Sequence, residues 1–505
     1  MSANEKESRA EQKAERKAAA AEEQDKKNRR YRRNAAIVIA ILVVLIVFAL
    51  VVNSNLFYTK STALTIGGTK YTPAEVNYFY QSTYNNIYQN LRSQLGDYIS
   101  LAIDTTKPLS EQIDPYGDGS ETWADVIKAT AQDEMTRVTA LYDAAVKAGR
   151  KLTDEDRASL DAEVEELKQY AATSGYPDIN KFMTAYFGKG ADLDLYTRMR
   201  ERIMVATAYS NDLDNGFSYT PEQLADYYSE HAAEYDTYYY YNYPINGSDK
   251  PFEGLEGEEL AAKIHEAAQK IADATTDLDS MTAAVREYTG ENTVLTIANN
   301  PVDNIGATYK DWITDPARQK NDVAVFDGEE VSYVVLFVEL CRNDYRAADF
   351  RHILVNAVPD EDGNYTEEAL ETAKGKAEEL LATWRNDPTE DNFAEMARLN
   401  SEDTGSYSNG GLYTDVTKYT MVPGVNDFLF DGTHTVGDTG VVFGQSSSYT
   451  GYHVMYYAGQ AEQNYCDTLA DTALRSADYT AALSALTSDY TVVEGSGMRF
   501  VNAIK

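Results

Sequence analysis

Two histidines in strand-like segments are the residues of this chain best suited to form a chemical site. His352 lies in the run Arg-His-Ile-Leu-Val (351–355), and His453 in the run Thr-Gly-Tyr-His-Val-Met (450–455). An imidazole is uncommon in an apolar strand, and either histidine alone is more simply a hydrogen-bonded core residue. The two together, with the residues between them, point to a site. No Gly-x-Ser-x-Gly, His-Glu-x-x-His or Cys–His signature is present, so a hydrolase is not indicated.

The elements that must position these histidines follow from the residue pattern between them. A strand is predicted at 349–358, followed by a loop of turn-forming residues at 359–364. Thr366 is expected to cap a helix that runs to about residue 385, and apolar residues at helical spacing predict a second helix at 392–400. A glycine-containing loop, a short helix and two strands complete the segment. The predicted order is strand, two helices, loop, helix and two strands.

Seven short motifs in this segment resemble the parvulin family of peptidyl-prolyl isomerases, over residues 349–459. They are His-Ile-Leu-Val (352–355), Asn-Phe-Ala-Glu-Met-Ala (392–397), Asn-Ser-Glu-Asp (400–403), Gly-Gly (410–411), Met-Val-Pro (421–423), Val-Gly-Asp (436–438) and Gly-Tyr-His (451–453). No single motif is specific, but all seven occur in the family's order. The resemblance implies a domain with an antiparallel sheet flanked by helices and an isomerase activity.

The resemblance also assigns roles to residues. It implies that His352 and His453 form the paired histidines, that Asp403 is the polar residue between them, and that Met421 belongs to the pocket for the proline ring. The other substrate-binding candidates are Val425, Phe430, Ser401 and Thr450. Val425 stands where the family usually has Phe, and Leu412-Tyr413 stands where it commonly has Asp-Leu. We therefore expect a shallower pocket and a weaker activity than in a typical member.

The implied chemistry needs neither a nucleophile nor a bound group, and no cofactor or metal is predicted. Rotation about an X-Pro bond faces a barrier of about 18–20 kcal/mol, which an enzyme lowers by binding the twisted amide better than either planar form. An apolar slot that removes water, next to a hydrogen-bonded His–His–Asp cluster, can supply that preference. Whether Asp403 acts directly or only orients an imidazole is left open. If the pair is only a core hydrogen bond, the domain binds peptides and catalyses little.

The amino-terminal region predicts a membrane anchor. Residues 1–34 contain 11 Lys and Arg and 7 Asp and Glu, and residues 35–52 are uninterrupted apolar, long enough to cross a bilayer. Basic residues before the apolar run predict a single-pass protein of the cell membrane, with residues 1–34 as a cytoplasmic tail and the rest extracytoplasmic. A cleaved signal peptide is the alternative, although no Ala-x-Ala site follows.

The remainder of the chain is strongly acidic, with 34 Lys and Arg against 74 Asp and Glu. Such a charge argues against nucleic acid as a partner and favours solubility or an affinity for basic clients. Two cysteines, Cys341 and Cys466, flank the parvulin-like segment. They are expected either to form a disulfide or to remain as two free thiols, because the sequence does not fix their distance. The oligomeric state is not indicated.

The predicted fold class is α+β, with one transmembrane helix, a mostly helical chaperone domain and two parvulin-like domains. A strand and helix near residue 63, and a helix opening with Thr220-Pro221-Glu222, resemble the chaperone domain of SurA-like and PrsA-like foldases. Residues 236–342 echo the parvulin pattern but have no histidine in the first or last strand, which predicts a degenerate, catalytically silent repeat. The predicted domains are 1–34, 35–52, 53–235 (completed by 462–505), 236–342, 345–460 and a carboxyl-terminal helix and strand at 461–505.

The sequence therefore predicts a membrane-anchored extracytoplasmic foldase. Its partners would be unfolded or newly secreted polypeptides, whose X-Pro bonds it would isomerise, and the membrane, through one helix. Two alternatives remain open. One is a catalytically silent holdase that binds unfolded chains, and the other is an envelope scaffold that uses the parvulin fold to hold one folded partner.

Overall fold

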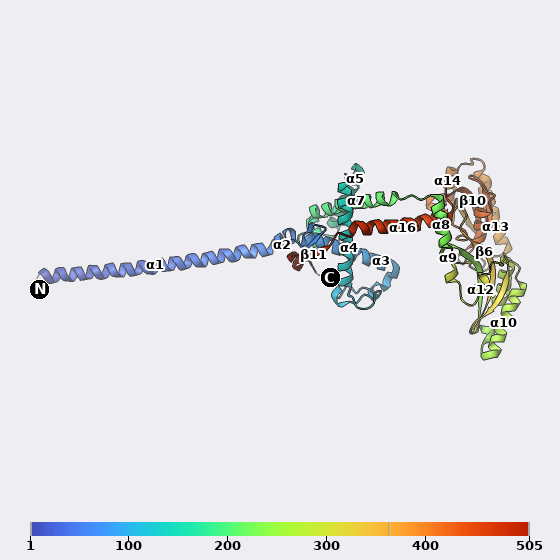
Figure 1. The fold of residues 1–505 in the computed structure, drawn as a ribbon, viewed down its shortest axis with the longest axis horizontal. Coiled ribbons are helices and arrows are strands. Elements are labelled where there is room, and N and C mark those ends of the chain that lie inside the picture. The colour runs from blue at the N-terminus through green and yellow to red at the C-terminus, as the bar shows by residue number, and fades with distance from the viewer. Residues whose placement is uncertain (1–2, 362, 503–505) are drawn as a thin grey trace. The chain divides into compact units, whose positions relative to one another are not determined.

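The computed structural model divides the chain into two compact units (Figure 1). It describes residues 3–361 and 363–502, with side chains for 13–47 and from 54 onward. The first unit comprises Met1–Phe217 and Asp478–Lys505, and the second comprises Ser218–Ala477. Helix α16, Tyr465–Thr487, begins in the second unit and ends in the first. The first unit is thus built from both ends of the chain.

The first unit combines a small sheet with a set of helices. Strand β1 (Leu64–Ile66) pairs antiparallel with both β2 (Thr69–Tyr71) and the carboxyl-terminal β11 (Val492–Glu494). Thr72 caps the next helix through a reciprocal hydrogen-bond pair with Glu75, as its place before a proline predicts. The helices are α1 (Ala3–Asn53), α2 (Leu56–Lys60), α3 (Pro73–Leu95), α4 (Trp123–Lys147), α5 (Asp154–Thr173), α6 (Ile179–Phe187) and α7 (Leu193–Asn215).

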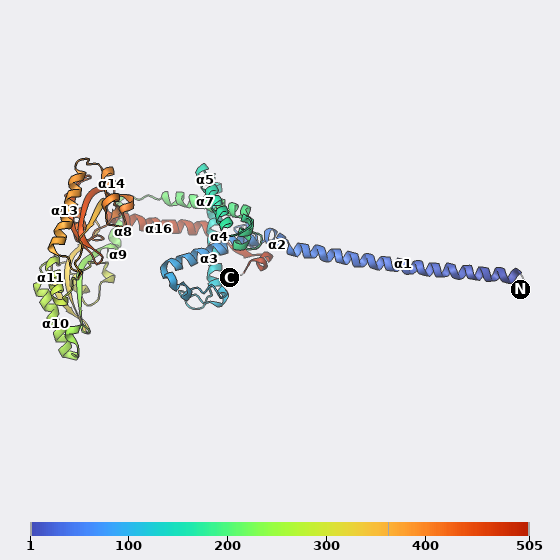
Figure 2. The ribbon, with the colours of Figure 1, turned by 180° about the vertical axis from the view of Figure 1, so that it is seen from behind.

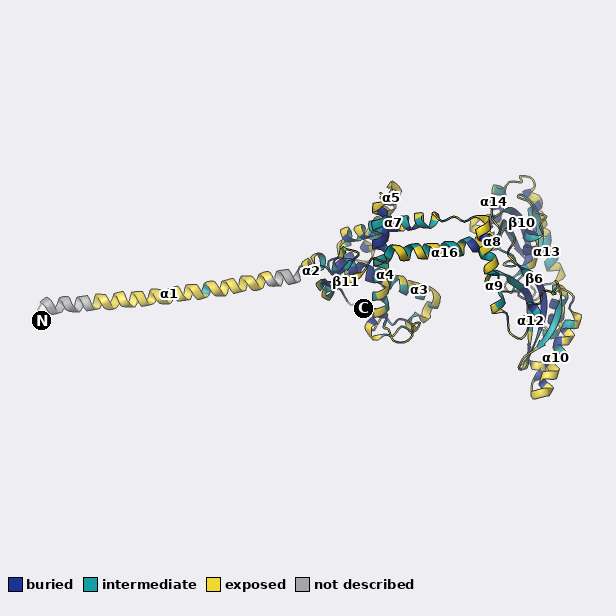
Figure 3. Ribbon diagram, in the orientation of Figure 1, coloured by how far each residue is buried: buried dark blue, intermediate teal, exposed yellow. Residues whose placement is uncertain are grey.

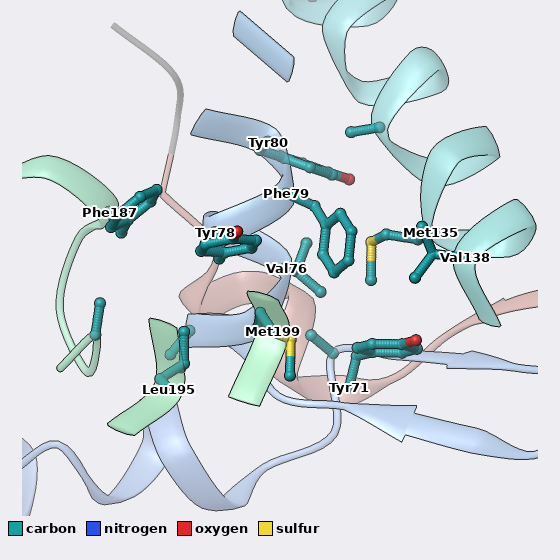
Figure 4. Close-up of a cluster of buried hydrophobic side chains, with 14 of the residues drawn as sticks. Tyr71, Val76, Tyr78, Phe79, Tyr80, Met135, Val138, Phe187, Leu195 and Met199 are labelled. Carbon is teal, nitrogen blue, oxygen red and sulfur yellow. The ribbon is translucent and has the colours of Figure 1, made fainter. Parts of the chain in front are cut away.

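The core of the first unit is rich in aromatic side chains (Figure 4). Phe79 lies edge-on to Tyr71 and Tyr78, with ring centroids 6.3 and 5.5 Å apart. The buried Tyr71 hydroxyl lies 2.7 Å from the Thr139 hydroxyl on α4, so its polar end is paired. These tyrosines therefore pack as ordinary core residues. Tyr78 and Phe79 both belong to α3, so this helix lies in the core of the unit.

The predicted transmembrane helix is wrong. Within the part of the chain that the structure describes, no helix is both long and apolar enough to cross a membrane. The apolar run instead forms the end of α1, whose described side chains are almost all exposed (Figure 3). The side chains of 48–52, the last residues of the predicted span, lie outside the described residues. The predicted single-pass location with a cytoplasmic tail depended on this span and is wrong with it, and contact with a membrane through one helix is not supported.

The second unit contains two four-stranded antiparallel sheets with the same strand order. In the first module (237–341) the order is β4-β3-β6-β5, and in the second module (348–460) it is β8-β7-β10-β9. The strands are β3 (Thr237–Asn246), β4 (Ala298–Asn300), β5 (Val323–Asp327), β6 (Val331–Cys341), β7 (Ala348–Asn356), β8 (Leu412–Val416), β9 (Thr439–Gln445) and β10 (Thr450–Gln460). The mixed α+β character of the chain is thus clear, with two antiparallel sheets of matching topology.

Helices cover one face of each of these sheets, and α10, α11 and α13 lie along the same side of the unit (Figure 2). In the second module, α13 and α14 pack on β7 and β10 around Ile353, Phe393 and Val454. Short helices α8 and α9 precede the first module. The helices are α8 (Pro221–Glu230), α9 (Ala232–Tyr235), α10 (Gly257–Ala274), α11 (Leu278–Thr289), α12 (Lys310–Ile313), α13 (Glu367–Trp384), α14 (Glu390–Asn400) and α15 (Pro423–Phe430).

The β7–β10 pairing leaves no room for a side chain at Gly451. A Cβ atom there would lie 2.3 Å from the Val355 carbonyl oxygen of the paired strand, closer than any tolerated contact. We predict that Gly451→Ala destabilises the second module by roughly 1–3 kcal/mol, because the backbone must shift to admit the methyl group. Urea unfolding followed by hydrogen exchange of β7 and β10 peptides measures this change.

The matched control is Gly459→Ala on the same strand. A Cβ atom at Gly459 would meet its nearest neighbour at 3.6 Å, an ordinary contact distance. This variant should therefore stay within about 0.5 kcal/mol of the wild-type protein. Equal destabilisation by the two substitutions would contradict the close strand approach at Gly451.

Candidate functional site

The pleat of two neighbouring strands brings His352 and His453 together. Successive residues of a strand point to opposite faces of the sheet, so Ile353 and Val454 face the helices while the two histidines share the other face. In the β7–β10 register His352 lies opposite Met455, and His453 lies opposite Leu354. The histidines are thus diagonal neighbours across the strand pair, a position from which long side chains reach each other.

A chain of hydrogen bonds links the pair to two further groups. The two Nδ1 atoms of His352 and His453 lie 2.8 Å apart, and His352 Nε2 lies 2.9 Å from Asp403 Oδ2. At the other end, His453 Nε2 lies 3.0 Å from the Tyr449 hydroxyl. Both imidazoles are buried, with 6% and 3% of their surface exposed. Every ring nitrogen of the pair therefore has a partner.

The protonation of this chain follows from the acid at its end. The hydrogen bond from His352 is the main cause that holds the pKa of Asp403 well below its usual value, so Asp403 is a carboxylate that only accepts. Burial, with the neighbouring His352, lowers the pKa of His453 to about 3, so this imidazole is neutral at pH 7. Because Asp403 only accepts, His352 Nε2–H donates to it, and the contact between the two Nδ1 atoms joins one donor to one acceptor.

Asp403 itself is held by a set of short-range contacts. Its carboxylate accepts hydrogen bonds from the Gly405 backbone N–H at 3.1 Å, from the Tyr413 hydroxyl at 3.0 Å and from the Ser406 hydroxyl. The Ser401 hydroxyl accepts from the backbone N–H groups of Asp403 and Leu354, which ties the Asp403 loop to β7. The carboxylate is therefore fixed in position before any substrate binds.

Not every residue predicted to bind substrate lies on an open surface. Val425 is buried, with 2% exposed, in the core beneath α15, and Phe430 packs edge-on against Tyr345, with ring centroids 5.4 Å apart. Thr450 is also buried and accepts a hydrogen bond from the Gln445 amide at 3.0 Å. Met421 is partly exposed at the edge of the same core. Met421 and Phe430 are thus partly exposed, and Val425 and Thr450 are buried.

Gly444 on β9 is buried and packs directly against the histidine pair. A Cβ atom at this position would lie 2.4 Å from His453 Nε2 and 3.0 Å from Val422 Cγ2. His453, Gly444 and the Met421–Val422 segment are therefore immediate neighbours. A proline ring resting near Met421 would place its amide bond close to the imidazole pair.

Three residues of the network were not predicted: Ser406, Tyr413 and Tyr449. Tyr413 was visible only as a departure from the family pattern, and its ring stacks on Phe350 with centroids 5.3 Å apart. Ser406, three residues after Asp403, and Tyr449, four before His453, carry no signal of their own in a single sequence.

The two cysteines are both free, Cys341 buried and Cys466 partly so.

The matching protein-family model covers this part of the chain. Residues 352–459 match the model described as "Rotamase: PPIC-type PPIASE domain", a span that begins at His352 and ends in β10. No curated protein sequence matches the chain.

Among solved structures, the foldase protein PrsA from Streptococcus pneumoniae is 12% identical, with 74% of this chain and 88% of that chain covered and a TM-score of 0.24. PrsA from Bacillus anthracis is 11% identical, with 56% and 94% covered and a TM-score of 0.19. The SurA-like chaperones PEB4 and Cj1289 of Campylobacter jejuni give a match at 12% identity, 67% and 84% coverage and a TM-score of 0.16.

With TM-scores this low, the structural likenesses carry no argument about the whole chain, so the assignment depends on the family model. The motifs, the strand order and the paired imidazoles of the second module all agree with it. The predicted membership is confirmed: residues 352–459 are a parvulin-type peptidyl-prolyl cis/trans isomerase domain.

Proposed function

We propose that this protein is a foldase that isomerises X-Pro bonds in unfolded polypeptides, with His352, His453 and Asp403 as its catalytic group. The observation that carries the proposal is the buried, fully paired chain of hydrogen bonds from Tyr449 to Asp403. The site has no exposed nucleophile among these residues. In this proposal the site catalyses by the surroundings that it gives the amide bond, and it forms no covalent bond with the substrate.

The catalytic task is to favour the twisted amide. At a twist of about 90° the amide loses the resonance that makes rotation slow, and its carbonyl becomes less polar. A water-free surface next to Met421 and Val422 destabilises the more polar planar forms relative to the twisted one. The histidine pair adds directed hydrogen-bonding groups, and the neutral His453 places no full charge next to the proline ring.

The positions of Asp403, Tyr413 and Ser406 support an orienting role for the carboxylate. Asp403 contacts His352 Nε2 and lies on the far side of that ring from His453. Its function in the proposal is to fix the His352 tautomer, which in turn fixes the direction of the Nδ1–Nδ1 hydrogen bond. Asp403 thus acts through the imidazoles, and direct contact with the amide is not required.

A cavity in the first unit supports a chaperone role. It has a volume of about 550 Å³ and is walled by aromatic side chains from α3, α5, α6 and α7, including Tyr78, Tyr170, Phe182, Tyr186 and Tyr196. Tyrosine rings offer large contact areas with few rotatable bonds, which suits the binding of varied apolar segments. We propose that this cavity holds unfolded clients whose X-Pro bonds the second unit isomerises.

Each proposed function is assigned to its own segment of the chain. Residues 53–235 with 462–505 would form the chaperone domain, 236–342 a silent module and 345–460 the isomerase domain. The first module has the strand order of the second, yet neither β3 nor β6 contains a histidine. A holdase without catalysis is the second candidate function. It is favoured because Val425 stands where the family usually has Phe and is buried, so the proline pocket lacks its usual aromatic wall.

Removing the proposed catalytic group should abolish isomerisation. We predict that His352→Ala and His453→Ala each lower the catalysed cis/trans exchange rate of short X-Pro peptides by roughly tenfold or more, because the directed hydrogen bonds are lost. Asp403→Asn, which keeps the side-chain volume, should lower it as well. Exchange NMR on the full chain measures the rate, and His265→Ala on the exposed face of α10 is the control. An active His352→Ala protein would refute the assignment.

Client binding should depend on the aromatic cavity. We predict that a Tyr170→Ala/Tyr186→Ala protein suppresses the aggregation of several unrelated unfolded proteins less well than the wild-type protein, because both rings wall the cavity and are partly exposed. Light scattering during refolding measures the effect. Tyr98→Ala, which removes a tyrosine of the same unit that is 71% exposed and outside the cavity, is the matched control. Equal suppression by all three proteins would exclude the cavity, and capture of one folded partner would favour a scaffold.

Acid should destabilise the second module through His453. Below pH 6.5 the unfolded chain binds a proton at this imidazole, whereas the folded chain does not until about pH 3. The contribution of His453 to stability is therefore complete above about pH 6.5 and decreases as the pH falls, by at most about 1.4 kcal/mol per pH unit. Hydrogen exchange of β7 and β10 peptides at pH 7 and pH 5 should show this loss in the wild-type protein and a smaller loss in His453→Gln. The same loss in both proteins would show that His453 is not the cause.

A further inference from the structure

A cavity of about 540 Å³ lies between the two modules of the second unit. The first module contributes Tyr241 from β3, Leu278 from α11, the segment 294–297 and two apolar side chains of β6. The second module contributes the segment 419–423 before and into α15, and residues 445–447 at the end of β9. The client cavity of the first unit is separate from this space, and the proposed isomerase surface shares only Met421 and Val422 with it.

The wall formed by residues 418–422 is firmly held by the first module. Tyr419 has a left-handed backbone (φ 60°), which is costly for a side chain of this size, and its ring lies 4.3 Å from that of Tyr239. Lys418 accepts a hydrogen bond at its carbonyl from the Tyr239 hydroxyl, and its ammonium lies 3.4 Å from Glu339. Such a conformation persists only where the surroundings fix it, so the cavity is preformed.

The cavity shares two residues with the proposed proline-binding surface, because Met421 and Val422 line it. Val422 also borders the catalytic pair: its Cγ2 would lie 3.0 Å from a Cβ atom at Gly444, a buried residue whose Cβ would meet His453 Nε2 at 2.4 Å. A peptide bound with its proline near Met421 therefore has its next residues at the mouth of this cavity.

The lining determines what the cavity can accept. Its floor is apolar, formed by Leu278, Leu295, Ile297 and the β6 side chains. Three carboxylates lie around it, Asp277, Asp279 and Asp427, against a single ammonium at Lys320. An apolar side chain gains from burial on such a floor, and a neighbouring cation gains from the carboxylates.

We propose that this cavity is a specificity subsite that binds the client residues flanking the isomerised proline and selects a large apolar residue adjacent to Lys or Arg. The inference rests on the proposed function, because it assigns the substrate class of the same isomerase site. The first module then has a role without catalytic residues: it forms half of the subsite and holds the segment that carries Met421.

The test compares X-Pro peptides that differ only in their flanking residues. A short Gly-Ala-Pro-Gly peptide is extended on either side by Leu-Lys, Leu-Glu or Gly-Gly, and kcat/KM for cis/trans exchange is measured by NMR with the full chain. Leu-Lys on one side should raise kcat/KM roughly tenfold over Gly-Gly, the lower end of what burial of a leucine side chain provides. Leu-Glu should give a smaller gain.

Substitutions then locate the effect. Ser447→Trp places a large ring in the cavity and should reduce the Leu-Lys to Gly-Gly ratio to near one, whereas Ser448→Trp, at the next exposed residue and outside the lining, should keep the wild-type ratio. A double variant, Asp279→Asn/Asp427→Asn, should lose the preference for Lys over Glu. Its control is the double variant Asp303→Asn/Asp311→Asn, whose carboxylates lie outside the lining and which should retain the preference.

The outcomes separate this inference from the proposed function. Catalysed exchange of every peptide with no gain from Leu-Lys, or a gain that Ser447→Trp leaves intact, overturns the subsite alone. If no peptide is accelerated, the isomerase proposal fails. Fluorescence anisotropy of a labelled Leu-Lys peptide then decides the subsite: weaker binding to Ser447→Trp than to Ser448→Trp supports it, and equal binding overturns it.

Discussion

The hydrogen bond between His352 and His453 is the interaction on which the architecture of the site depends. Two imidazoles facing each other at 2.8 Å in a buried space are tolerable only if their outer nitrogens are also paired, and Asp403 and Tyr449 provide those partners. The need for these partners fixes the loop after α14 and the turn before β10. Much of the second module therefore serves to exclude water from this hydrogen bond and to fix its direction.

The two modules share a strand order but divide their tasks. In the second module, the face of the sheet away from α13 carries the polar network. In the first module the corresponding face is filled by an apolar and tyrosine-rich cluster around Tyr240, Tyr309 and Phe337, so it is a core rather than a site. The first module thus has packing surface where the second has its site, and contacts through Tyr239 join it to the isomerase domain.

Much of the site could be predicted because its strongest signals are local. The alternation in β7 and β10, the threonine before α13 and the motif order predicted that His352, Asp403 and His453 lie together, and the hydrogen bonds between them agree; their catalytic role stays a prediction. Helix α14 begins two residues before the predicted start at 392, after its cap Thr389. Val425 was assigned to the pocket by family position, and its burial depends on packing across the module, which no local pattern encodes; Phe430 is only partly buried, against Tyr345. The apolar run at 35–52 was interpreted from hydropathy alone, and that prediction failed. The left-handed Tyr419 and its contact with Tyr239 join segments about 180 residues apart, beyond the reach of sequence spacing.

The pairing of β11 with β1 has a consequence for the order of folding. Leu64 meets Glu494 across this sheet, a separation of about 430 residues, so the first unit lacks one strand until the ribosome has made nearly the whole chain. The second unit, by contrast, is continuous between Ser218 and Ala477 and can fold during synthesis. Closing so long a loop is slow, which makes completion of the first unit the late step. A truncated chain that ends before Val492 would contain the whole isomerase domain but would leave the edge of β1 unpaired.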